Sequence, residues 1–292
     1  MSELPGSDAD DIAQIQYTSG SRDAQGSDAP PPRHREQREV HTQRLGLGRR
    51  DVWLCPMPLF HTGGCVGGVL CAVQAQATLV LMSEFDPGVA LDLIEQEHVT
   101  AMLGVPTMLI GMREHPTLDR RDTATFQRVM FGGTTVPAEL VRDLQTTFGT
   151  ELQIFYGKTE AAPVVTQTRS TDSPEDMAGT VGTAQPQTEV AILDPDTHEV
   201  LPVGQQGEIC TRGYLVMAGY HDQPEATAIA IDEDGGCTPV TSAQWTSAGT
   251  CGSPVASRTW SSGAREHLPT RDRGSAVRAS DCLGGRRDRP AR

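Results

Sequence analysis

The sequence predicts an α/β fold in which parallel β-α-β units are followed by a β-rich, barrel-like part. Between 44 and 170, short apolar runs alternate with helical segments at short intervals, which is typical of parallel strands joined by helices. Between 171 and 235, short strands are separated by Pro, Gly and Asp turns. Two other stretches, 22–43 and 236–292, lack the aliphatic side chains that a core requires, and we expect both to be disordered.

The α/β part is predicted from buried runs and helix-start signals. Strands are expected at 52–54, 78–82, 99–103, 128–131 and 151–155. Helices are expected to begin in the glycine-rich stretch after His61, at Asp86-Pro87, at Pro106 and at Pro137, because proline suits the first helical turn. The last of these helices should stop at Gly149.

The flanking parts are predicted in the same way. Upstream, 15–17 should form a strand that enters the turn Thr18-Ser19-Gly20-Ser21. In the β-rich part, strands are expected at 181–183, 189–193, 207–212 and 215–218, and a short helix after Gly219-Tyr220. The length of 292 residues suggests about two domains.

Composition excludes several classes of function. The net charge of −14 resides in an acidic body followed by an arginine-rich end, which argues against a nucleic-acid partner. The seven cysteines form no CxxC pair, and Cys55, His61, Cys65 and Cys71 match no zinc spacing; reduced thiols in a cytoplasmic protein are expected. No signal peptide is expected at the start, and the apolar stretch 63–82 is too interrupted by glycine and glutamine for a transmembrane segment.

One stretch carries most of the predicted chemistry. An apolar run enters the turn Tyr156-Gly157-Lys158-Thr159-Glu160, and ligands of open α/β sheets bind at the carboxyl ends of parallel strands. A threonine hydroxyl can donate to a phosphate oxygen, a glutamate can hold Mg²⁺, and a tyrosine ring offers a flat face to a base. The alternative is an ordinary loop whose threonine and glutamate begin a helix.

Five blocks, taken in order, resemble the acyl-adenylate-forming superfamily, which includes AMP-forming acyl-CoA synthetases, firefly luciferase and the adenylation domains of peptide synthetases. The blocks are Tyr17-Thr18-Ser19-Gly20-Ser21, Pro58-Leu59-Phe60-His61, Phe131-Gly132-Gly133-Thr134, Tyr156-Gly157-Lys158-Thr159-Glu160, and Gly207-Glu208-Ile209-Cys210 continuing to Gly219-Tyr220. The sequence around His61 and after Tyr220 is most similar to fatty acyl-CoA ligases. The resemblance covers about 8–235, apart from 22–43.

The resemblance implies a reaction and its cofactors. ATP and a fatty acid would form an acyl-adenylate with loss of pyrophosphate, and coenzyme A would then take the acyl group and release AMP. It also implies roles for individual residues. Thr18, Ser19, Gly20 and Ser21 would hold the β and γ phosphates, Thr159 the α-phosphate and Glu160 a Mg²⁺ ion. Gly132, Gly133 and Thr134 would line the adenine slot, with Tyr156 and Gly157 beside the base.

His61 would lie where the acyl chain enters, although a histidine that merely begins a helix fits its position equally well. Lys158 occupies a variable position of the family motif, and no role is expected for it.

The sequence departs from the family at two places. Arg22-Asp23-Ala24-Gln25-Gly26 stands where the family phosphate loop continues as Thr-Gly-x-Pro-Lys-Gly. The aspartate for the ribose and the catalytic lysine are expected beyond Gly235, yet no lysine follows Lys158, and the segment that usually precedes the phosphate loop is absent. We therefore expect a partial copy with weak or no activity. The alternatives are a non-catalytic remnant that binds AMP, ATP or an acyl group, and a chain that does not fold stably.

A frame shift in the gene would explain both departures. The chain has no asparagine and a single lysine, which indicates G- and C-rich codons. With such codons, the stretch from Arg22 can be written so that a shift of one base reads GTPKGAMLRHRGIVNNAKF. The stretch from Gly236 can likewise yield LHTGDLGAVDERGYLR, which contains the family's ribose block. We therefore predict that 22–43 and 236–292 are family sequence read out of frame. This divides the chain into 1–21, 22–43, an AMP-binding subdomain 44–170, a β-rich subdomain 171–235, and 236–292.

Overall fold

The structure, a computed structural model, describes residues 11–18, 26–29, 39–132, 136–237, 242–244 and 251. Its centre is a seven-stranded sheet in the order β4-β3-β5-β6-β7-β8-β9. These strands are β3 (Val52–Cys55), β4 (Thr78–Leu81), β5 (Ala101–Gly104), β6 (Arg128–Gly132), β7 (Glu151–Tyr156), β8 (Thr166–Gln167) and β9 (Thr183–Ala184). Strands β4, β3, β5, β6 and β7 pair in parallel, in that order. Strand β8 pairs antiparallel with β7, and β9 pairs antiparallel with β8. The α/β prediction is thereby confirmed.

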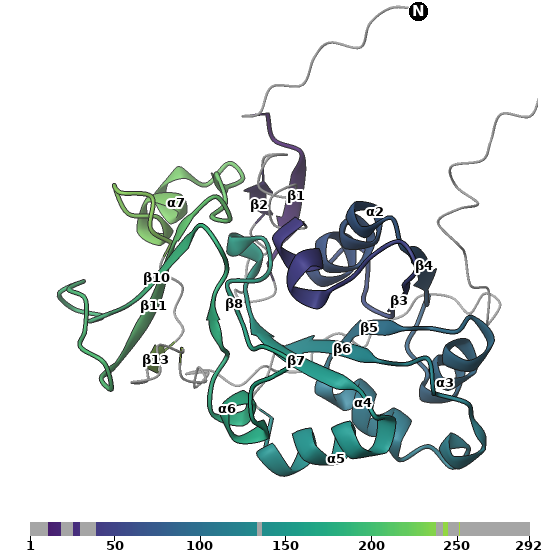
Figure 1. The fold of residues 1–292 in the computed structure, drawn as a ribbon. Coiled ribbons are helices and arrows are strands. Elements are labelled where there is room, and N and C mark those ends of the chain that lie inside the picture. Colours follow the sequence, from purple (N-terminus) through teal and green to yellow (C-terminus); the bar gives the residue numbers. More distant parts are fainter. Residues whose placement is uncertain are drawn as a thin grey trace, which may run out of the picture.

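Helices cover both faces of this sheet (Figure 1). They are η1 (Gly63–Leu70), α2 (Cys71–Ala75), α3 (Pro87–Gln96), α4 (Pro106–Arg113), η2 (Leu118–Arg120) and α5 (Ala138–Phe148). On one face α3, α4 and α5 bury side chains such as Leu91, Leu109 and Leu144 against the strands. On the other face α2 and the residues around Leu45 enclose the buried Trp53. Because helices cover both faces of the sheet, the side chains on both sides of each strand are buried. This explains why the strand sequences are continuous apolar runs.

The predicted helix ends have visible physical causes. Asp86 precedes Pro87 at the start of α3, and its carboxylate accepts a hydrogen bond from the backbone N–H of Val89 at 2.9 Å. This bond satisfies one of the N–H groups that have no partner within the helix. Helix α5 ends at Gly149, whose φ of 65° lies in the left-handed region that glycine adopts without strain.

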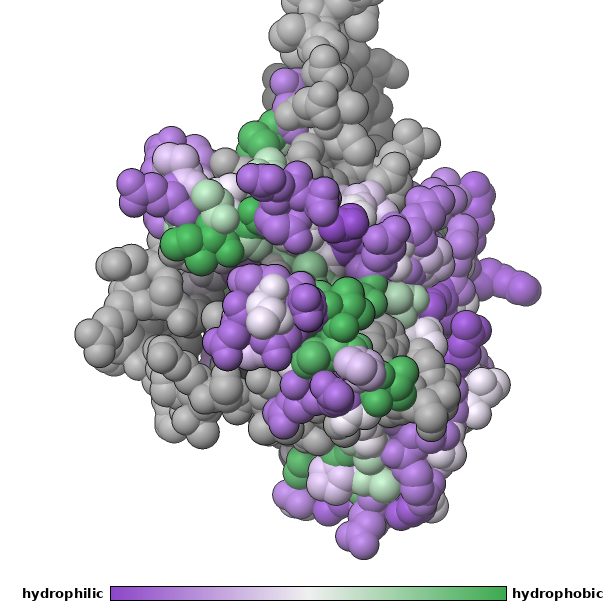
Figure 2. Space-filling model, turned by 90° about the vertical axis from the view of Figure 1, so that its left-hand side faces the viewer, coloured by the Kyte–Doolittle hydropathy of each residue, from purple (hydrophilic) through white to green (hydrophobic). Residues whose placement is uncertain are grey.

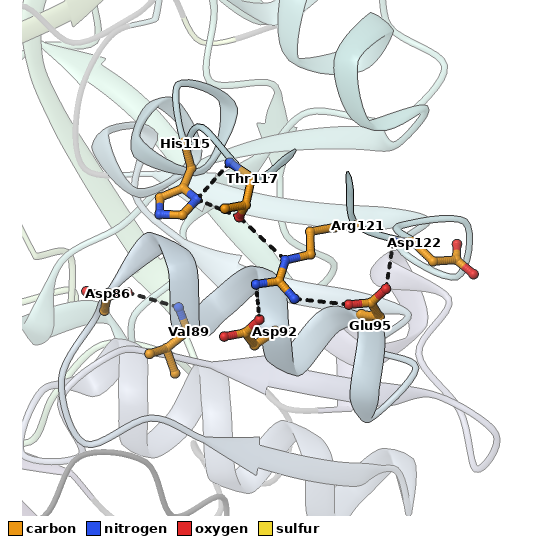
Figure 3. A network of polar contacts seen from close by, with 8 residues as sticks. All are labelled: Asp86, Val89, Asp92, Glu95, His115, Thr117, Arg121 and Asp122. Atoms are coloured by element: carbon orange, nitrogen blue, oxygen red, sulfur yellow. Dashed lines mark hydrogen bonds and ion pairs between the residues drawn. The ribbon is translucent and has the colours of Figure 1, made fainter. Parts of the chain in front are cut away.

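An ionic network fixes the loop that follows α4 to helix α3 (Figure 3). Arg121 forms ion pairs with Asp92 and Glu95, which lie one turn apart on α3. The backbone N–H of Asp122 also donates to the Glu95 carboxylate at 3.2 Å. His115 contacts the Thr117 hydroxyl at 2.9 Å within the same loop. These polar contacts act together with Leu118, which packs against the main hydrophobic cluster from the same loop.

Two three-stranded antiparallel sheets form the rest of the described fold. One contains β10 (Thr188–Leu193), β11 (Gln206–Gly213) and β13 (Ser242–Gln244); the other contains β1 (Gln14–Tyr17), β2 (Gly26–Ala29) and β12 (Gly219–Tyr220). The remaining helices are η3 (Thr159–Ala161), α7 (Pro224–Ala230) and α6 (Pro174–Gly179), whose Met177 is buried in the main cluster of the large sheet. A second hydrophobic cluster, which includes Ile192, Ile209 and Leu215, joins β10 and β11 to the end of β7.

Two expectations of disorder are wrong for the residues that the structure describes. Within 22–43, Gly26–Ala29 forms β2, and residues 39–45 are helical. Within 236–292, Cys237 pairs with Thr211, Ser242–Gln244 forms β13, and the Cys251 N–H donates to the carbonyl of Gly182. The amino-acid composition of these stretches could not predict β2 and β13. Strands pair through backbone N–H and C=O groups, which every residue except proline carries in full.

The expected strand at 215–218 is also wrong. This segment is a turn, in which the N–H of Val216 donates to the carbonyl of Gly213 at 3.2 Å. The N–H of Met217 instead bonds the carbonyl of Glu160 at 2.8 Å. The apolar side chains of this turn are buried, and Leu215 and Val216 belong to the second cluster. A buried turn therefore shows the same run of apolar residues as a buried strand.

Apolar surface on the face that bears the antiparallel sheets is divided into separate patches by hydrophilic residues (Figure 2). Among the exposed large apolar side chains are Val200 and Val203, between β10 and β11, and Ile229 of α7. Scattered apolar side chains of this kind are ordinary on a folded protein. No helix within the described ranges is long and apolar enough to span a bilayer.

Candidate functional site

Three of the predicted blocks follow strands whose carboxyl ends lie at one edge of the large sheet. His61 follows β3, Gly132 is the last residue of β6, and Gly157 follows β7. Strands β6 and β7 are neighbours, with Gly132 opposite Phe155, and β5 lies between β3 and β6. This is the edge at which open α/β sheets bind their ligands.

Both glycines at this edge are required by close packing. A Cβ on Gly132 would lie 2.6 Å from the carbonyl oxygen of Phe155. A Cβ on Gly157 would overlap the carbonyl of Pro163. The chain can therefore fold back sharply after β7, and this turn delivers Thr159 and Glu160 in the short helix η3.

Glu160 is fixed by two contacts with the segment around β12. Its side-chain Oε1 accepts a hydrogen bond from the Tyr220 hydroxyl at 2.9 Å, and its carbonyl accepts the N–H of Met217 at 2.8 Å. Burial, and then the nearby Glu160 charge, raise the pKa of the Tyr220 phenol. The phenol therefore stays protonated and acts as a donor to the carboxylate. Tyr220 belonged to a motif block, but no role was predicted for it.

The strand that carries Tyr220 also links Glu160 to the predicted phosphate loop. Tyr220 pairs with Ser27 of β2, and Ser27 pairs with Gln16 of β1. Thr18 lies just beyond the end of β1, so the sheet brings it to the neighbourhood of Tyr220. The other predicted residues of the phosphate loop and adenine slot, Ser19, Gly20, Ser21, Gly133 and Thr134, lie outside the described residues.

Lys158 has a contact that the sequence did not predict. Its Nζ donates to the carbonyl oxygen and the Sγ of Cys237, each at 3.2 Å. Burial raises the pKa of the Cys237 thiol, and the Lys158 charge acts in the opposite direction. The partner lies in a segment predicted to be disordered, so no sequence signal could have identified it. Lys158 thereby places a cation one residue before Thr159.

The remaining predicted residues lie at the same edge in different environments. The His61 Nδ1 accepts a hydrogen bond from the N–H of Gly63 at 2.9 Å, and burial lowers the pKa of the ring. This contact is the helix-start arrangement, and the predicted role at the acyl entrance stays a prediction. The Tyr156 side chain is only 9% exposed and lies in the second hydrophobic cluster. Its contact with a base likewise stays a prediction.

Comparison with known proteins identifies the family to which the chain belongs. The family model described as "AMP-binding enzyme" matches residues 34–221. The acyl-CoA ligase sidI of Aspergillus fumigatus is 35% identical over 231 residues, which is 77% of this chain and 39% of that protein. The mitochondrial medium-chain acyl-CoA ligase ACSF2 of Danio rerio is 34% identical over 231 residues, 77% of this chain and 38% of that protein.

The fold of this chain also matches that of a solved structure. The structure of ATP-bound MatB from Rhodopseudomonas palustris matches with a TM-score of 0.77 and 25% identity, over 85% of this chain and 48% of that one. The chain thus spans less than half the length of these relatives. It belongs to the AMP-binding enzyme family, the superfamily of AMP-forming acyl-CoA synthetases and ligases.

Proposed function

We propose that this chain carries the nucleotide-binding part of a fatty acid–CoA ligase. The whole reaction joins ATP and a fatty acid to give acyl-AMP and pyrophosphate, and coenzyme A then displaces AMP to give acyl-CoA. The observation that supports the proposal is the hydrogen bond by which Tyr220 holds Glu160 just beyond β7, because Tyr220 also belongs to the sheet of β1, β2 and β12.

Different residues at this edge would contact different parts of ATP. Thr159 would donate its hydroxyl to the α-phosphate, and Thr18 with Ser19, Gly20 and Ser21 would hold the outer phosphates. Gly132, Gly133 and Thr134 would border the adenine with Tyr156. Lys158 adds positive charge beside the same turn, which favours a polyanionic ligand.

The metal proposal is consistent with the available ligands. Within the described residues, no group of three or more His, Cys, Asp or Glu side chains could hold a metal ion. Mg²⁺ in phosphate-transfer sites is usually held by one or two carboxylates together with substrate phosphates. Glu160 supplies one such carboxylate, and Tyr220 occupies only its Oε1. Glu160 would therefore bind a Mg²⁺ that arrives with ATP, and that ion would neutralise phosphate charge.

A fatty acid is the acid that we propose, from the sequence around His61. Other acids are used in the same family, since parsley 4-coumarate–CoA ligase 2 is 31% identical over 238 residues. A cytoplasmic location is proposed from the sequence, because its seven cysteines are odd in number and form no CxxC pair.

We further propose that ligase activity of this chain is weak or lost. Arg22–Gly26 stands where the family phosphate loop carries its lysine block. Preorganised donors to transferring phosphoryl groups each contribute orders of magnitude in rate. The second candidate function, a remnant that binds AMP, ATP or an acyl group without turnover, is supported by Thr159 and Glu160, which keep the motif positions.

The test combines sequencing with an exchange assay. The gene is sequenced again across the codons for 20–44 and 234–266, and the chain is assayed for ATP–pyrophosphate exchange with a series of fatty acids. Confirmed frame breaks and no exchange would support the remnant. Frame breaks that vanish would make the full-length product a complete ligase with the same site residues. If neither alternative frame encodes the GTPKG and HTGD blocks, the frame hypothesis is wrong.

A further inference from the structure

Tyr220 is held from several sides where Glu160, the proposed metal ligand, meets the sheet of β1, β2 and β12. Its N–H donates to the Thr227 hydroxyl at 2.8 Å, and its backbone pairs with Ser27. A Cβ on the preceding Gly219 would lie 3.0 Å from the Thr227 side chain, so β12 and α7 are in close contact. The tyrosine therefore has little freedom to move away from Glu160.

Glu160 gains its orientation from this fixed partner. The Tyr220 hydroxyl donates to Oε1 of Glu160 at 2.9 Å, so one oxygen of the carboxylate is fixed by a protein donor. Carboxylates that bind metals are themselves commonly held by outer hydrogen-bond donors, and loss of such a donor weakens metal affinity. A phenylalanine at this position would keep the ring and lose only the donor.

We propose that Tyr220 is a positioning residue for metal binding: its hydroxyl fixes the Glu160 carboxylate, and its strand couples that carboxylate to the β1–β2 phosphate-loop sheet. This inference rests on the proposed function, because the cation concerned is the one that accompanies ATP. Tyr220 acts through Glu160 and needs no contact with the nucleotide. Removing its hydroxyl should therefore change the dependence of binding on Mg²⁺ more than the binding of metal-free nucleotide.

The experiment titrates Mg²⁺ into the full chain with a fluorescent ATP analogue, for wild type, Tyr220→Phe and Glu160→Gln. Tyr214→Phe is the matched control, since it removes the phenol of another tyrosine that packs against the second cluster. Tyr220→Phe should raise the half-saturating Mg²⁺ concentration about tenfold, the loss expected for one hydrogen bond to a charged group. Its affinity for nucleotide in EDTA should match that of the wild type.

The possible outcomes separate the two proposals. If the wild type fails to bind the analogue with Mg²⁺, the proposed function and the inference both fail. If Glu160→Gln loses the Mg²⁺ dependence while Tyr220→Phe retains the wild-type curve, only the role of Tyr220 is overturned. An equal loss of metal-free binding in Tyr220→Phe would show a purely structural role and would also overturn the inference. A Mg²⁺ shift in Tyr214→Phe as large as that in Tyr220→Phe would do the same.

Discussion

His41 should make the stability of the folded chain depend on pH. The residue lies in the helical segment 39–45, is 1% exposed, and neither ring nitrogen has a hydrogen-bond partner among the described residues. Burial, assisted by the charge of Arg44, lowers the pKa of His41 from 6.5 to about 4. The folded chain therefore holds this ring neutral at pH values where the unfolded chain protonates it.

The sign and size of the effect follow from this difference. Above about pH 6.5 both states are neutral, and stability is unaffected; below it, the unfolded state binds a proton that the folded state refuses, so stability falls as pH falls. The full difference corresponds to about 3 kcal/mol, of which about 2 kcal/mol should be lost by about pH 5. His41→Leu should remove this part of the pH dependence. It should also stabilise the fold near pH 7 by about 1 kcal/mol, because a buried ring without hydrogen bonds is replaced by an apolar side chain.

Urea unfolding at several pH values tests the prediction. The quantity of interest is the difference in unfolding free energy between wild type and His41→Leu, because His61 also has a lowered pKa and contributes to the wild-type curve. His221→Gln, which changes an exposed histidine, is the matched control variant. Parallel curves for wild type and His41→Leu would refute the buried, neutral histidine described for this segment.

Three further substitutions test packing and ion pairing in the fold. Arg44→Ala should cost about 2–3 kcal/mol in urea unfolding, because the guanidinium donates to several acceptors on β8 and β9 that would lose their partner; a cost below about 0.5 kcal/mol would contradict these contacts. Gly157→Ala should abolish folding or shift the far-UV spectrum, since its Cβ would overlap Pro163; a native-like melt would disprove the sharp turn. Arg121→Ala should cost about 1 kcal/mol or less, since its partners are partly exposed, and high salt should shrink that cost (Figure 3); a salt-independent loss would point to packing instead.

Local sequence signals were sufficient for most of the α/β part. Proline at the start of α3 and α4, the glycine after α5, and continuous apolar strands each have a local physical cause, so no tertiary information was needed. The turn from Gly157 to Glu160 was predictable for the same reason. Its placement at the sheet edge follows from the general rule for parallel sheets.

Contacts between distant segments could not be predicted in this way. Tyr220 and Glu160 are separated by 60 positions, and Lys158 and Cys237 by 79. Pairing of β2 with β1 and β12 depends on backbone groups, which leave no compositional signal. His41 was assigned to a polar, disordered stretch, although the helical segment buries it.

The central claim is that the edge bearing Thr159 and Glu160 binds nucleotide. Calorimetric titration of the full chain with ATP and Mg²⁺ tests it directly, beside a Thr159→Ala, Glu160→Gln double variant whose fold is checked by circular dichroism. The wild type should bind saturably, and the double variant should lose most of that binding. No binding by the wild type, or equal binding by the two folded proteins, would contradict it.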